Sequence, residues 1–134
     1  MARKDPEVAL ERVRRICNSM PECFEKLSHG EPTFFVRKRV FAMCSLNHHD
    51  DGHIAVLVPT RPGHQALLIE DAPETYYYPK YVGCKGWVGI EINKIKDPEL
   101  TTLVRDAWNL VAPKTLVRQK NSWVDSGSGS LPSE

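Results

Sequence analysis

Residues 33–44 read Thr-Phe-Phe-Val-Arg-Lys-Arg-Val-Phe-Ala-Met-Cys, which is two apolar runs around a short basic break. Aromatic and β-branched side chains are frequent in both runs, and such side chains favour extended strands. Two strand-like runs separated by only a few charged residues predict a β-hairpin with its turn at Arg37-Lys38-Arg39. The hairpin in turn predicts an antiparallel sheet at the centre of the fold.

Two later segments extend that sheet. Residues 53–58 (His-Ile-Ala-Val-Leu-Val) form another strand-like run, reached through a polar turn that contains Asp51-Gly52. Residues 86–92 alternate apolar with small or polar side chains, which is typical of a strand with one face in the core. Residues 71–79 show neither a helical nor a strand period and predict a loop. We therefore expect three or more strands before this loop and one or two after it.

The first segment of the chain predicts a helix that ends at Pro21. Asp5 and Pro6 are typical of a helix start, and the apolar residues that follow recur at intervals of three and four. The arginines of this segment are expected on its solvent-exposed side; they are Arg12, Arg14 and Arg15.

Two more helices are predicted. Thr60 with Pro62 marks the start of one, whose apolar side is residues 66–69, and Asp97 marks the start of the other. A short helical turn is expected around residues 116–118. The order helix, strands, helix, strands, helix predicts an α+β fold of two layers, in which helices cover an antiparallel sheet.

The charge of the chain is balanced but uneven. Its 134 residues include 18 Lys and Arg against 17 Asp and Glu, a net charge of +1. Residues 1–45 carry nine basic and six acidic side chains, whereas residues 46–79 carry one and five. The total charge therefore gives no support to unspecific binding of polyanions. A balanced total charge is nevertheless compatible with a local basic surface. We expect one domain over residues 1–122 and a flexible Ser/Gly-rich tail over residues 123–134.

The sequence also predicts a cytoplasmic protein. No apolar run approaches the ~20 residues of a membrane-spanning helix, and the N-terminal residues lack the apolar segment of a secretory signal. The four cysteines have no CxxC spacing and are expected to be buried, reduced thiols; they are Cys17, Cys23, Cys44 and Cys84.

Two stretches of the chain resemble the MmcQ/YjbR family. Residues 28–42, Ser-His-Gly-Glu-Pro-Thr-Phe-Phe-Val-Arg-Lys-Arg-Val-Phe-Ala, are similar to the family's hairpin. Residues 81–90, Tyr-Val-Gly-Cys-Lys-Gly-Trp-Val-Gly-Ile, are similar to its glycine-bracketed strand. The resemblance covers residues 6–120 and implies a YjbR-like two-layer domain.

Members of that family are usually labelled DNA-binding, by likeness to a double-wing domain that lays its sheet on DNA. The resemblance thus implies binding of DNA, and the leading hypothesis from the sequence is a non-enzymatic protein that binds nucleic acid through a basic hairpin or sheet surface. This chain departs from the family at the turn of the hairpin, where glycine is common but Arg37-Lys38 stand here. Either the turn is longer, or it accepts backbone strain in order to carry charge.

Six residues are the candidates for contact with nucleic acid. They are the cations of the predicted hairpin turn and a later group that mixes cations with a tryptophan: Arg37, Lys38, Arg39, Lys80, Lys85 and Trp87. Cations neutralise phosphates, and an aromatic ring stacks on bases. The alternative is that the charged turn only keeps the surface soluble and that the aromatic residues cover the edge of the core.

Other functions are less well supported by the sequence. A protein-interaction module of chaperone-like architecture is one alternative, with an unknown partner. A small anionic ligand near Cys84 and Lys85, between Gly83 and Gly86, is another. The segment 48–53 (His-His-Asp-Asp-Gly-His) holds metal-capable side chains but is expected to be a solvated loop. We expect no cofactor, no metal and no catalytic constellation.

Overall fold

Six strands form one antiparallel sheet in the computed structural model, which describes residues 6–47 and 52–119. The strands are β1 (Cys23–Ser28), β2 (Glu31–Val36), β3 (Arg39–Leu46), β4 (Ile54–Pro59), β5 (Tyr76–Tyr77) and β6 (Trp87–Glu91). They are ordered β1-β2-β3-β4-β6-β5, so that β1 and β5 are the two edges. The predicted α+β fold with an antiparallel sheet is confirmed.

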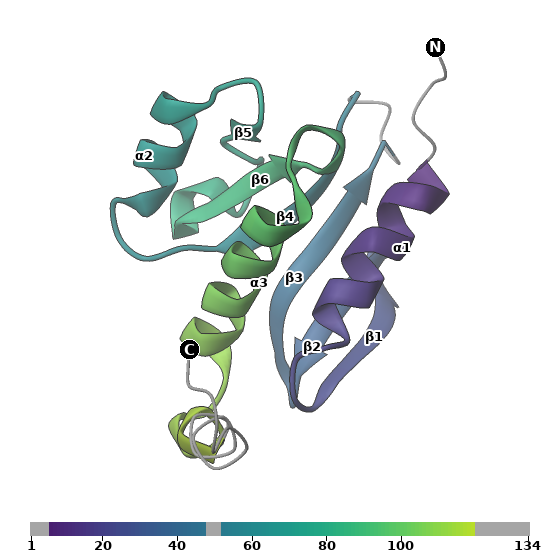
Figure 1. The fold of residues 1–134 in the computed structure, drawn as a ribbon, viewed down its shortest axis with the longest axis vertical. Coiled ribbons are helices and arrows are strands. Elements are labelled where there is room, and N and C mark those ends of the chain that lie inside the picture. Colours follow the sequence, from purple (N-terminus) through teal and green to yellow (C-terminus); the bar gives the residue numbers. More distant parts are fainter. Residues whose placement is uncertain (1–5, 48–51, 120–134) are drawn as a thin grey trace.

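Three α-helices pack with the sheet: α1 (Pro6–Cys17), α2 (His64–Asp71) and α3 (Asp97–Val111). Helices α1 and α3 lie across the same face of the sheet, whereas α2 lies beside β5 at the far edge (Figure 1). The short 3₁₀ helices η1 (Gly83–Lys85) and η2 (Ile92–Lys94) flank β6, and the expected helical turn is present at residues 114–119. The predicted boundary between residues 122 and 123 lies outside the described residues.

The core fills the space between the sheet and helices α1 and α3. Alternate residues of the strands point into it, among them Phe34 and Val36 of β2, because successive side chains of a strand point to opposite faces. Val13 of α1 and Trp108 of α3 are fully buried against them. The Trp108 indole donates a 3.0 Å hydrogen bond to the carbonyl of Pro21, so its polar atom is satisfied inside the core.

The other face of the sheet, which we call the open face, has neither α1 nor α3 on it. Phe24, Phe35 and Val40 occupy one row of this face across β1, β2 and β3, since they are paired residues of adjacent strands. Met43 and Leu57 form another row that reaches Gly89 of β6. The open face is therefore largely apolar although no long helix covers it.

Four local predictions were wrong. Helix α2 begins at His64 rather than at Thr60, because the Thr60 hydroxyl donates to the carbonyl of Gly86 (2.7 Å) and does not cap a helix. No side chain of α2 is fully buried, and Leu67, expected on its apolar side, is 64% exposed. The predicted loop over residues 71–79 contains strand β5, where the ring of Tyr77 lies against Gly89. The first helix also ends at Cys17, before Pro21.

The arginines of α1 were expected only to face solvent, but two of them also bind other parts of the fold. Arg12 donates to the Asp97 carboxylate and to the carbonyls of Ile92 and Ile95, which ties α1 to the start of α3. Arg14 forms a bidentate salt bridge with Glu25 of β1, in which both N–O distances are 2.7 Å. Arg12 and Arg14 therefore hold α1 in place from both sides.

Arg12→Ala should destabilise the protein by about 2 kcal/mol, because it removes charge-assisted hydrogen bonds to two main-chain carbonyls. Arg15→Ala is the matched control, since Arg15 reaches the same Asp97 from an exposed position. Urea unfolding measures both variants. The Arg12 hydrogen bond holds the pKa of Asp97 below its ordinary value, so the stabilisation from the Arg12–Asp97 pair, unlike that from the carbonyl bonds, is present above that ordinary value and is lost as the pH falls through the lowered pKa. Equal stability losses in the two variants would contradict the assignment.

Candidate nucleic-acid interface

The turn between β2 and β3 is short and strained. Val36 pairs with Arg39, so Arg37 and Lys38 alone make the turn. Arg37 has φ of 57°, a left-handed conformation that costs a residue with a Cβ about 1–2 kcal/mol. Of the two alternatives left open by the sequence, the turn is therefore the strained one and not the longer one.

Arg37 is held by an acidic neighbour. Its Nε donates to Oε1 of Glu22 at 2.7 Å and its terminal nitrogen to Oε2 at 3.2 Å. Glu22 also has a left-handed backbone, with φ of 56°. The hydrogen bonds from Arg37 hold the pKa of Glu22 below its ordinary value. The guanidinium is thus oriented by two hydrogen bonds, and its charge is compensated locally.

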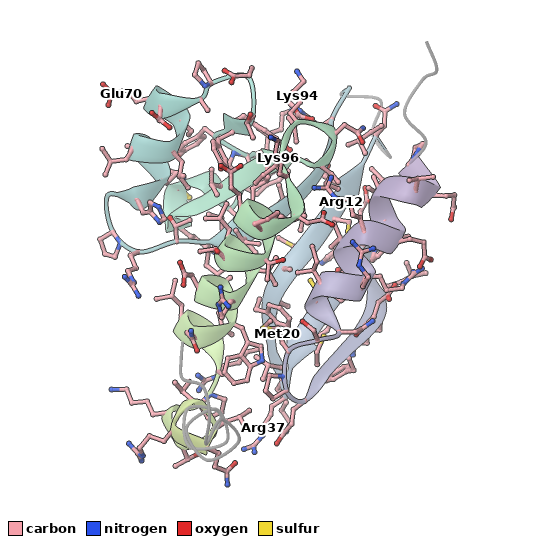
Figure 2. The ribbon with its side chains drawn as sticks, viewed as in Figure 1. Arg12, Met20, Arg37, Glu70, Lys94 and Lys96 are labelled. Atoms are coloured by element: carbon pink, nitrogen blue, oxygen red, sulfur yellow. The ribbon has the colours of Figure 1, made fainter. Side chains whose placement is uncertain are left out.

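Arg39 connects this turn to the end of α3. Its guanidinium donates to the carbonyl of Val111 at 3.0 Å, where the last carbonyls of a helix lack intrahelical partners. The helical turn 114–119 follows at once and is anchored by the buried Leu116. Figure 2 shows Arg37 at the lower end of the molecule, beside this turn.

The Arg39 contact brings two basic segments of the chain to one end of the molecule. We call this region the basic end, and it consists of Arg37, Lys38, Arg39, Lys114 and Arg118. Lys38, Lys114 and Arg118 are exposed, and within the described part of the chain none of the three is in an ion pair. Lys114 and Arg118 were not among the residues singled out from the sequence, since only the fold places them near the hairpin.

The second predicted group lies elsewhere. Lys80 and Lys85 are exposed in the connection between β5 and β6, and Trp87 is half-buried on the open face opposite Pro59. Gln65 of α2 holds this connection by donating to the carbonyls of Gly83 and Trp87. In Figure 1 the connection between β5 and β6 lies beside α2, away from the β2–β3 turn. The six predicted residues therefore form two separate groups.

The glycines of this connection have structural roles. A Cβ on Gly83 would lie 2.6 Å from the ring of Tyr78, so only glycine fits under that ring. Gly86 has φ of 91°, which a residue with a side chain rarely adopts. The expectation of four buried thiols was wrong for Cys84, which is exposed because it lies in the surface connection before β6, with its sulfur 3.4 Å from the carbonyl of Tyr81. A small anionic ligand at this place stays a prediction.

The described residues give weaker support for a ligand pocket or a metal site. One shallow hollow lies between β4, α2 and α3, and its lining includes Arg61, His64 and Asp106 but not Cys84 or Lys85. Among residues 6–47 and 52–119, no group of three metal-capable side chains comes together. Residues 48–51 of the histidine-rich segment lie outside the described residues. His53 stacks on Tyr77 and its Nδ1 contacts the Glu91 carboxylate.

The strain at Arg37 can be measured with two variants. Arg37→Gly and Arg37→Ala both remove the ion pair with Glu22, but only glycine relieves the left-handed conformation. Arg37→Gly should therefore be more stable than Arg37→Ala by about 1 kcal/mol, the reverse of the usual order in regular structure. Urea unfolding of both variants measures the difference. If the alanine variant is the more stable one, the turn does not have this geometry.

Within the described residues, no helix is long and apolar enough to cross a membrane. No match to the chain was found among curated proteins. In fold, it is similar to the crystal structure of Deinococcus radiodurans protein DR2400, family-model domain DUF419, with a TM-score of 0.65, 16% identity and 81% of each chain covered. The family model described as YjbR matches residues 18–110, which is more than half of the sequence. The chain therefore belongs to the YjbR family.

Proposed function

We propose that this protein binds nucleic acid, DNA or RNA, by holding the phosphate backbone at its basic end, and that it does so without catalysis. The observation that carries the proposal is the hydrogen bond from Arg39 to the carbonyl of Val111. This bond places the cations of the β2–β3 turn beside those of residues 114–118. A balanced total charge is compatible with such a role because the cations are gathered locally.

The exposed cations of the basic end suit phosphate binding. Lys38, Lys114 and Arg118 project from a tight turn and a short helical turn, so a polyanion can reach them without desolvating the core. Each phosphate that is neutralised releases condensed counterions, which favours association and makes it salt-dependent. Arg39 is held by its hydrogen bond to α3, so it presents a preorganised charge between the two segments.

The chemistry of two partly or fully buried thiols supports a role in binding without catalysis. Burial raises the pKa of the Cys23 thiol to about 11 and that of Cys44 to about 12, so both thiols are protonated and poorly nucleophilic at neutral pH.

All four cysteines are free, in keeping with a reducing cytoplasm, where we place the protein.

The proposal predicts a specific loss of salt dependence. Replacing Lys38, Lys114 and Arg118 together by alanine should weaken oligonucleotide binding, and the slope of log affinity against log salt should become shallower by about 2–3. Fluorescence anisotropy over a range of salt concentrations measures both quantities. The double variant Lys94→Ala, Lys96→Ala is the control, since these lysines lie far from Arg37 (Figure 2). Losses in proportion to the number of charges removed, three against two, would mean that only total charge matters.

Glu22 should restrain binding, because it compensates Arg37. Glu22→Gln removes that negative charge, so we expect tighter oligonucleotide binding with a salt slope steeper by up to about one. Glu70→Gln changes the charge equally at a distant exposed position and is the matched control (Figure 2). The same anisotropy titration serves here. An equal gain in both variants would remove any special role for the Glu22–Arg37 pair.

A second candidate function is a protein-interaction module. Strand β1 is an edge of the sheet, and its Leu27 is 71% exposed. Such an edge can accept a strand from a partner through main-chain hydrogen bonds. Stable co-purification of a protein partner, together with no affinity of the purified chain for DNA or RNA, would favour this role over the first.

A further inference from the structure

An aromatic pair adjoins the basic end on the open face of the sheet. Phe24 of β1 and Phe35 of β2 are directly paired, and their rings are parallel within 8° with centroids 5.2 Å apart. Phe24 is 44% exposed although one side of its ring lies against Phe35. An exposed and already stacked phenylalanine can extend its stack onto another flat ring.

A cation belongs to the same surface. Lys26 pairs with Thr33 and so points to the open face, as Phe24 does, and its ammonium lies 5.1 Å from the centroid of the Phe35 ring. The neighbouring carboxylate of Glu25 points to the opposite face, where it binds Arg14. The aromatic pair is therefore bordered by positive charge and not by a carboxylate of β1.

The pair also adjoins the turn that carries Lys38, one of the phosphate-binding cations proposed above. Phe35 of β2 precedes Lys38 of the turn by three residues, a separation of at most about 10 Å along the chain. A strand of nucleic acid held at the basic end would thus have its bases within reach of the open face. In a duplex the bases are stacked inside the helix, so only an unpaired base can reach such a ring.

We propose that Phe24 and Phe35 form a stacking site for unpaired nucleobases, so that the preferred ligand of the basic end is a single-stranded nucleic acid. This inference rests on the proposed function and names its substrate class. A second copy of the chain is a poorer occupant of the open face. A two-fold interface uses the same patch twice, which would bring the cationic surfaces of both copies together.

The test compares two probes with equal backbone charge: a short single-stranded oligothymidylate, and a deoxyribose-phosphate strand of the same length without bases. The unmodified protein should bind the oligothymidylate at least five-fold more tightly. Phe24→Ala should weaken oligothymidylate binding by about 5-fold to 150-fold, since stacking contributes roughly 1–3 kcal/mol per base. Its affinity for the abasic strand and its salt slope should not change, because no charge is lost.

Two further variants separate stacking from structure. Leu27→Ala removes a more exposed apolar side chain of the same strand that points to the opposite face, and it should leave both affinities unchanged. Phe24→Leu keeps an apolar residue of similar size but removes the aromatic ring, so it should weaken oligothymidylate binding while circular dichroism and urea unfolding confirm the fold.

The outcomes distinguish this inference from the proposed function. Equal affinity of the unmodified protein for both probes, with no effect of Phe24→Ala, would overturn the stacking site but leave phosphate binding at the basic end. A Phe24→Ala variant that changes only the sedimentation behaviour, from dimer to monomer, would assign the open face to a second copy. No binding of either probe would overturn the proposed function itself.

Discussion

The two-residue turn between β2 and β3, together with the irregularity that shifts the pairing between Phe34 and Phe35, sets the register on which the rest of the molecule depends. Because side chains alternate along a strand, a shift of one residue would move Phe34 and Val36 out of the core and Phe35 into it. The register thus decides three things together: the contents of the core, the aromatic pair on the open face and the position of the turn cations. It requires a left-handed residue in the turn, and that residue is Arg37. The strain at Arg37 is accordingly a property of the register and not of an irregular loop.

Electrostatic interactions divide the basic residues into two groups with different roles. Arg12 and Arg14 are bound by carboxylates and main-chain carbonyls, and they connect α1 to α3 and to β1. Their charge is used within the fold and is not available to a ligand. Lys38, Lys114 and Arg118 are exposed and form no ion pair with any described carboxylate. The distinction explains why counting charges along the sequence could not separate cations that hold the fold together from exposed, unpaired ones, whereas the partners of each cation do.

Sequence patterns were sufficient for the fold but not for the arrangement of the site. The strands were predictable because apolar side chains repeat with a period of two, and the helices on the sheet because Val13 and Trp108 lie on continuous apolar stripes. Strand β5 was missed because two residues are too few to show a period. The start of α2 was misplaced because Thr60 resembles a helix cap, although its hydroxyl binds a distant carbonyl. Lys114 and Arg118 could not be assigned to the site, since their proximity to the turn depends on the tertiary contact of Arg39.

The basic end and the aromatic pair would contribute different kinds of free energy to one ligand. Phosphate contacts weaken with salt because they depend on counterion release, whereas stacking on Phe24 is insensitive to salt. A strand bound by both would lose only part of its affinity as salt rises, and the part that remains would depend on unpaired bases. Glu22 would reduce the first contribution without touching the second, because it binds Arg37 and does not contact the aromatic rings. If the basic end holds phosphates and the aromatic pair stacks on bases, selectivity for single strands would follow, since a duplex would gain only the salt-sensitive contribution.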